Sequence, residues 1–265
     1  MKNDKVKILI IDDEQVVIDS LVKICTLAGY DCDVALTAEE GLLKLREEKF
    51  DLAMCDIMLP EMSGFEVLQE TKAQSINTYV IMTTGYSTVE NAVKSLYEGA
   101  IAYAPKPFEV DEILSILRRG VNFLKIEKIR KSADTSEIVY VDCPSKYYRL
   151  GIASWVNVTD EGSALVGATD VYLKTVDTFD KIEFKEIGDE IYQGTPCAVF
   201  HEGEEYAHNL LSPVSGKIIE RNEELINNIN IIEKDPFFNG WLYRIIPSDI
   251  EYELKNVTSC SSEQI

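Results

Sequence analysis

Hydrophobic and polar positions follow two alternating periods along the first 130 residues. Short apolar runs, typical of buried strands, are followed by stretches whose apolar residues lie three and four positions apart, typical of amphipathic helices. This pattern predicts strands at 6–11, 31–36, 51–56, 78–85 and 100–107, and helices at 14–29, 37–48, 64–73, 88–99 and 110–131. Strands that alternate with helices predict a parallel sheet with both faces covered.

Local signals mark several helix ends. Thr37 followed by Glu40 predicts a capping box at the start of one helix, and Gly29 predicts the end of another. The last helix of this region becomes polar toward its end. We expect a core helix that frays beyond Lys128, followed by a flexible linker at Ser132–Glu137. The alternative is a continuous helix that carries a phosphorylation signal through a homodimer of this region.

The pattern changes from Ile138 to about Asp249. Short segments of alternating polarity, separated by glycine-containing turns, replace the helical spacing. Strands are predicted at 137–142, 153–160, 163–170, 181–187, 197–202, 216–222 and 240–246, and one short helix within 222–232. Regularly spaced short strands predict an antiparallel sandwich or barrel.

Composition narrows the function classes. The 265 residues allow about two domains, and the net charge of −20 divides into −7 for residues 1–130 and −13 for residues 131–265. An acidic second half argues against a nucleic-acid module, which needs a basic face. No apolar run approaches the roughly 18 residues of a membrane span, so we expect no membrane insertion and a cytoplasmic protein. Six cysteines without a CxxC pair indicate neither a zinc site nor a disulfide framework.

Polar residues follow the predicted parallel strands where each strand ends. Asp12 and Asp13 follow the first strand, Asp56 ends the third, Thr84 the fourth and Lys106 the fifth. Ligands of open parallel sheets bind at this edge. Clustered carboxylates favour a hard divalent cation such as Mg²⁺, and a carboxylate can act as a nucleophile toward phosphorus. Phosphoryl transfer needs mainly positioning and charge neutralisation, and a cis bond before Pro107 would hold Lys106 in place.

Four stretches in the first half, LIIDDE, MCDIMLPEMSGFE, MTTGYS and AYAPKPF, resemble the receiver domain of bacterial response regulators in order and spacing. The resemblance implies an α/β flavodoxin-like fold of five strands and five helices, phosphorylated by a sensor histidine kinase. It assigns the phosphoacceptor to Asp56, the Mg²⁺ ligands to Asp12, Asp13, Asp56 and the backbone oxygen of Met58, and the phosphate-binding and switch positions to Thr84, Lys106 and Tyr103.

The second half resembles the glycine cleavage system H protein, a lipoyl carrier of the hammerhead class. The stretches that carry the resemblance are SWV, VGATDVY, DKIEF, IGDEI, SPVSGKI and GWLYRIIPSD. It implies a mainly-β, lipoyl-like domain. In that family the lipoylated lysine lies seven residues before the serine of SPVSG, and that position here is Glu205. A carboxylate cannot form the amide to lipoic acid, so we expect a lost lipoyl site and no lipoate.

The hairpin around Glu205 is acidic. His201, His208, Glu202 and Glu204 lie close to it in sequence and suggest a metal site, but neither histidine has a standard zinc spacing. A solvated hairpin tip or a binding surface on a rigid scaffold is the better interpretation.

These observations predict a receiver domain at 4–125, a helix extension and linker at 126–137, an H-protein-like domain at 138–250 and a polar tail at 251–265. The function expected is that of a two-component response regulator, a phosphoacceptor rather than an enzyme. Phosphorylation would act through the fourth and fifth helices and the fifth strand to dock, release or dimerise an output domain that binds a protein partner. The alternatives are a carrier modified at Lys185 or Lys217, a DNA-binding transcriptional regulator, and a phosphate sink.

Overall fold

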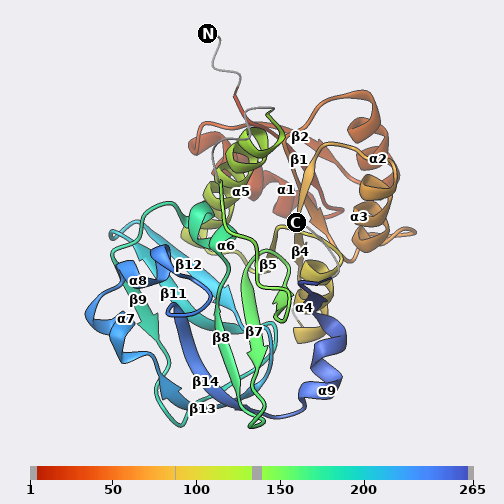
Figure 1. The fold of residues 1–265 in the computed structure, drawn as a ribbon. Coiled ribbons are helices and arrows are strands. Elements are labelled where there is room, and N and C mark those ends of the chain that lie inside the picture. Colours follow the sequence, from red (N-terminus) through yellow and green to blue (C-terminus); the bar gives the residue numbers. More distant parts are fainter. Residues whose placement is uncertain (1–4, 87, 133–138, 262–265) are drawn as a thin grey trace.

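The chain folds into two domains that lie against each other (Figure 1), and the computed structural model describes residues 5–86, 88–132 and 139–261. The N-terminal domain contains β1 (Lys7–Ile11), α1 (Gln15–Leu27), β2 (Asp31–Ala35), α2 (Ala38–Glu47), β3 (Leu52–Asp56), α3 (Gly64–Ala73), β4 (Tyr79–Thr84), α4 (Val89–Tyr97), β5 (Ala102–Pro105) and α5 (Val110–Lys131). Its strands form one parallel sheet in the order β2-β1-β3-β4-β5, which confirms the predicted α/β fold.

The two faces of this sheet carry separate hydrophobic cores. Successive residues of a strand point to opposite faces, so Ile8 and Ile10 pack with α1 and α5, whereas Leu9 and Ile11 pack with α2 and α3. All the strands run in one direction, so their carboxyl ends meet at a single edge. That edge gathers the predicted site residues.

One helix start differs from the prediction. Thr37 caps α2 through the Glu40 amide, but the Glu40 carboxylate accepts from the Leu36 amide, so the predicted capping box is incomplete. Helix α5 spans the predicted range to Lys131, and the fraying expected beyond Lys128 does not occur; the basic residues of its last turn interact favourably with the negative end of the helix dipole. Apart from Ser132, the predicted linker lies outside the described residues.

The C-terminal domain is mainly antiparallel β structure, as predicted. It contains β6 (Tyr148–Leu150), β7 (Ser154–Val158), β8 (Ala164–Ala168), α6 (Asp170–Val176), β9 (Lys181–Phe184), β10 (Glu190–Ile191), β11 (Pro196–Glu202), β12 (Tyr206–Leu211), β13 (Gly216–Arg221), α7 (Glu223–Asn227), α8 (Asn230–Lys234), β14 (Trp241–Pro247), α9 (Ile250–Glu253), the 3₁₀ helix η1 (Leu254–Asn256) and β15 (Thr258–Ser259). A seven-stranded sheet (β10-β13-β14-β8-β7-β6-β15) and a three-stranded sheet (β12-β11-β9) share one hydrophobic core.

Three local predictions for this domain are wrong. The described part of 137–142 forms no strand, because the Val141 amide donates to the Asp170 carboxylate instead of to a neighbouring strand. The single helix expected within 222–232 is two short helices, α7 and α8. The expected polar tail instead contributes α9, η1 and β15, and β15 pairs with β6.

The domains meet along α4 and α5. Val93 and Leu96 of α4 form one buried apolar cluster with Leu150 and Val257 of the C-terminal domain. On α5, the buried Asn122 amide donates to the backbone oxygen of Thr175 at 3.0 Å. The two helices of the expected signalling face are therefore partly covered by the C-terminal domain, and β5 between them faces a cavity that this domain closes.

Two glycines allow this close approach. Gly151 and Gly194 adopt φ values of +55° and +74°, and a Cβ at Gly194 would lie 2.7 Å from a Val93 methyl carbon. At Gly151 a Cβ would lie 3.1 Å from the Leu96 Cβ. Both positions thus require glycine for conformation and for space.

Candidate functional site

An ion cluster lies at the carboxyl edge of the parallel sheet. Asp12 follows β1, Asp56 ends β3 and Lys106 follows β5, so three separate strands position the three side chains. The Lys106 ammonium is 2.8 Å from Asp12 Oδ2 and 2.8 Å from Asp56 Oδ1. Both carboxylates are buried, with exposed fractions of 1% and 2%. The structure therefore brings together Lys106 and two of the three predicted acids, Asp12 and Asp56.

Burial and charge act in opposite directions on this cluster. Burial raises the pKa of Asp12 above its usual value, against the lowering effect of its bond to Lys106. For Lys106, burial lowers the pKa, but the hydrogen bonds and charges of Asp12 and Asp56 outweigh it and raise the pKa overall. The lysine is thus held in its charged form between two acids.

Backbone groups orient the remaining predicted residues. The Met58 amide donates to Asp56 Oδ2 at 2.5 Å, which fixes the carboxylate rotamer. Thr84 is fully buried, and its hydroxyl oxygen accepts from the Tyr86 amide at 3.1 Å. The Lys106–Pro107 peptide bond is cis, as predicted. Tyr103, on β5, lines the space between the domains rather than the acid cluster.

The acids fit a hard cation only in part. Within residues 5–86, 88–132 and 139–261, no group of three histidine, cysteine or acidic side chains converges as a metal site, and Asp13 is exposed. Among the described residues, however, the buried oxygens Asp12 Oδ2 and Asp56 Oδ1 have the Lys106 ammonium as their partner and no further hydrogen bond. Two such oxygens beside an exposed third acid suit Mg²⁺, which retains several waters.

The hairpin of β11 and β12 points its tip toward α5. Glu205 lies in the turn between the strands and is exposed. The adjoining Glu202 carboxylate pairs with Arg118 of α5, and the Arg118 guanidinium lies 4.8 Å from the ring centre of Tyr206. The hairpin that sequence reasoning linked to a lost cofactor arm therefore contacts the other domain.

Beside this contact, His208 is fully buried. Burial, followed by the charges of Arg119 and Arg118, lowers the pKa of His208 to about 3. The neutral ring accepts from Arg119 through Nδ1 at 3.1 Å, which assigns the proton to Nε2. The register pairs Phe200 with His208, so His201 points to the opposite face of the sheet. The two histidines cannot share a metal ion.

Comparison with known proteins identifies both halves. Residues 8–118 match the family model of the response regulator receiver domain, and residues 146–264 match that of the glycine cleavage H-protein. The chain thus contains a receiver domain at 8–118 and a glycine cleavage H-protein domain at 146–264. The H-protein match extends through the segment that pairs β15 with β6. No helix in the described part of the chain is long and apolar enough to cross a membrane.

Similar curated proteins are bacterial regulators. The chain is 34% identical over 128 residues to the transcriptional regulatory protein ZraR of Escherichia coli K12, covering 46% of this chain and 27% of that protein. It is 31% identical over 140 residues to the transcriptional regulatory protein DltR of Streptococcus agalactiae, covering 50% and 62%. A CheY-like receiver structure from Methanospirillum hungatei is 38% identical with a TM-score of 0.45, covering 47% of this chain and 99% of that one. The chain spans about a quarter of ZraR.

The contacts between the domains were not found from the sequence. Arg118, Arg119, Tyr206 and His208 join α5 to the hairpin, but they come from segments almost 90 residues apart. One signal was present. Two consecutive arginines interrupt the apolar spacing of α5, which is unusual for a helix whose faces are mostly covered.

Proposed function

We propose that this protein is a two-component response regulator in which Asp56 accepts a phosphoryl group and thereby changes the docking of the H-protein domain. The observation that carries the proposal is the buried Asp12–Asp56–Lys106 cluster, because its residue types and distances suit phosphoryl transfer to a carboxylate. The donor is the phosphohistidine of a sensor histidine kinase. The protein is a phosphoacceptor rather than an enzyme acting on a separate substrate.

The chemistry follows from the charges. A carboxylate oxygen of Asp56 attacks phosphorus, the bond from phosphorus to the kinase histidine breaks, and an acyl phosphate forms. Bound Mg²⁺, held by Asp12, Asp13, Asp56 and the Met58 carbonyl, would neutralise the added negative charge. Lys106 lies 2.8 Å from Asp56 and can transfer its ion pair to a phosphoryl oxygen. The buried Thr84 hydroxyl is a further donor for that group.

The same strand connects this chemistry to the domain interface. Lys106 follows β5, and Tyr103 within β5 lines the cavity that the H-protein domain closes. When Lys106 moves away from Asp12, the end of β5 moves with it. The covered face of α4, β5 and α5 then binds a different partner. The protein is thus a two-state switch that is biased by a local change of charge.

The released H-protein domain binds a protein partner, and the uncovered receiver face forms a homodimer. Lipoyl transfer is not part of this function, because the turn between β11 and β12 presents Glu205 where a carrier needs an amine. Lys185 and Lys217 are exposed but lie away from that turn, at the end of β9 and on β13. The strongly acidic second half disfavours DNA binding. The protein acts in the cytoplasm.

The test combines intact mass with small-angle X-ray scattering. The protein is incubated with Mg²⁺ and acetyl phosphate, and we expect one phosphoryl increment together with a larger radius of gyration. Asp56→Asn should show neither change, and chelation of Mg²⁺ should abolish the increment in the unaltered protein. A phosphoryl increment that persists in Asp56→Asn contradicts the assigned acceptor. An increment without expansion contradicts the release of the H-protein domain.

A further inference from the structure

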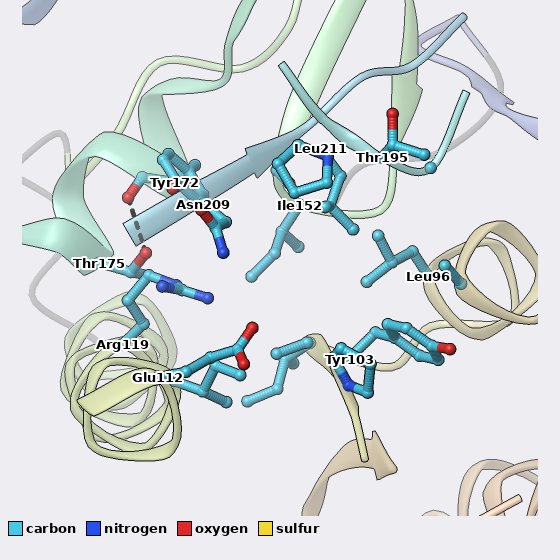
Figure 2. A pocket seen from close by; sticks show the side chains of 18 of the residues that line it. Leu96, Tyr103, Glu112, Arg119, Ile152, Tyr172, Thr175, Thr195, Asn209 and Leu211 are labelled. Carbon is cyan, nitrogen blue, oxygen red and sulfur yellow. Dashed lines mark hydrogen bonds between the residues drawn. The ribbon is translucent and has the colours of Figure 1, made fainter. Parts of the chain in front are cut away.

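A cavity of about 200 Å³ lies between the two domains (Figure 2). The receiver supplies one wall from α4, β5 and α5. The H-protein domain supplies the other, including Ile152, Asn209 and Leu211. Tyr103 marks the receiver wall, whereas the acid cluster around Asp56 does not line the cavity.

The cavity has a polar end and an apolar end. Figure 2 shows Glu112 and Arg119 of α5 and Asn209 of β12 pointing into the space from one side. Glu112 and Arg119 are seven residues apart, so two helical turns place them on the same face of α5. Leu96 and Leu211 lie toward the other side of the view.

The two charged groups at the polar end retain unused bonding capacity. The Arg119 guanidinium has five N–H donors, and its hydrogen bond within the described residues is the one to His208 Nδ1. Among the same residues, the Glu112 carboxylate has no hydrogen bond and no ion pair within 4.0 Å. Burial raises the pKa of Glu112 and lowers the pKa of Arg119, so each charge is partly removed from water. Both residues are half-buried, and polar groups partly withdrawn from water are normally satisfied by a partner or by ordered water.

We propose that this cavity binds a small apolar α-amino acid as its zwitterion. The ammonium group would pair with Glu112, the carboxylate with Arg119, and the side chain would fill the apolar end. A ligand with one charge would satisfy one of these residues and be repelled by the other. A neutral apolar ligand would leave the two charges with only their attraction for each other and would displace the water around them, at a cost in desolvation.

The volume limits the size of the ligand. An apolar cavity of about 150 Å³ accommodates benzene, so the present space suits about eight to ten non-hydrogen atoms, the size of leucine. Both domains line the site, and it is complete only when they are docked. By linkage, a bound amino acid stabilises the docked arrangement. The proposal depends on the docked domains and not on phosphorylation of Asp56.

The experiment is isothermal titration of the full chain without phosphoryl donor. The probes are L-leucine, 4-methylpentanoate, which lacks the amine, and 3-methylbutylamine, which lacks the carboxylate. We expect L-leucine to bind at least about tenfold more tightly than either analogue, which corresponds to about 1.4 kcal/mol. L-Alanine should bind more weakly because it leaves the apolar end empty. Equal affinities for the three probes, or no L-leucine binding at millimolar concentration, would overturn the proposal.

A variant pair separates recognition from stability. Glu112→Gln should weaken L-leucine about tenfold and leave 4-methylpentanoate unchanged or tighter, because the repelling carboxylate is gone. Asp111→Asn, an exposed neighbour on α5 with the same change in net charge, should leave the affinities for both probes unchanged. If Glu112→Gln weakens both probes equally, or if Asp111→Asn reproduces its effect, Glu112 does not bind an ammonium group and the proposal fails.

Discussion

Replacing Gly194 by alanine tests whether close packing holds the two domains together. The residue has φ +74°, and an added Cβ would lie 2.7 Å from a Val93 methyl carbon and 3.2 Å from the Val89 backbone oxygen. A non-glycine residue in this backbone region costs about 1–2 kcal/mol. Neither contact can yield cheaply, because Val93 is a short branched side chain on a helix and the oxygen belongs to the backbone. Overpacking of this kind adds about 1–3 kcal/mol.

Gly188→Ala is the matched control. Gly188 has φ +99°, and its added Cβ would have no atom within 4 Å, so the variant carries the backbone cost without the contact. Urea unfolding should show that both substitutions destabilise the protein. Only the added contact at Gly194 acts on the receiver, so only Gly194→Ala should weaken docking. A cost of 1–3 kcal/mol lowers the equilibrium constant for docking roughly 5- to 150-fold.

Small-angle X-ray scattering reads out the docking. We expect a larger radius of gyration for Gly194→Ala and an unchanged value for Gly188→Ala. Equal scattering of both variants, whether compact or expanded, would refute the reasoning that the Gly194–Val93 contact sets the domain arrangement.

Three further predictions concern other groups. Lys106→Met leaves Asp12 and Asp56 buried without a cation, so the free energy of unfolding in urea with a chelator should fall by about 3–5 kcal/mol. Millimolar Mg²⁺ should restore part of this stability. A loss that Mg²⁺ does not affect would contradict the cation site. In the folded protein the pKa of His208 is lowered to about 3, whereas the unfolded residue binds a proton below about pH 6.5. Between these pH values the unfolded state binds more protons than the folded state. The free energy of unfolding therefore falls as the pH falls through this window. The loss by pH 5 should be about 2 kcal/mol, and His208→Gln should lack this part of it; identical pH profiles of the variant and the unaltered protein would argue against a neutral, buried ring. Incubation with a lipoate ligase, lipoate and ATP should add a lipoyl mass increment to Glu205→Lys and none to the unaltered protein; an increment on the latter would indicate modification at Lys185 or Lys217.

The acid cluster could be predicted because it depends on local rules. A buried strand that ends in an acid is visible in the sequence, and parallel strands bring their ends to one edge. Asp12, Asp56 and Lys106 therefore met in space as the pattern implied. Whether Mg²⁺, Thr84 and Tyr103 act as the resemblance implies stays a prediction. The short helices α6 and α8 were missed because tertiary contacts, rather than periodicity, stabilise segments of five to seven residues.

The domain interface could not be predicted. In their own segments, Arg118 and Glu202 each have the pattern of an ordinary surface charge. The docking of two domains leaves no periodic pattern in the sequence. His208 also alternates correctly for a half-buried strand. Its alternation with the buried Leu210 is consistent with an inward position, but nothing local reveals its hydrogen bond with Arg119 of α5.

The covalent connection between α5 and the H-protein domain makes their docking a unimolecular event. A short tether holds two partners at an effective concentration of about 1 mM. Separate domains that bind with a Kd of only about 100 μM would then be docked roughly ten to one when joined, and a tenfold loss of affinity, about 1.4 kcal/mol, would bring docked and open forms to equal populations. An interface of modest affinity, made of the Arg118–Glu202 ion pair and the apolar cluster around Val93 and Leu96, can thus keep the chain closed and still yield to a local change of charge.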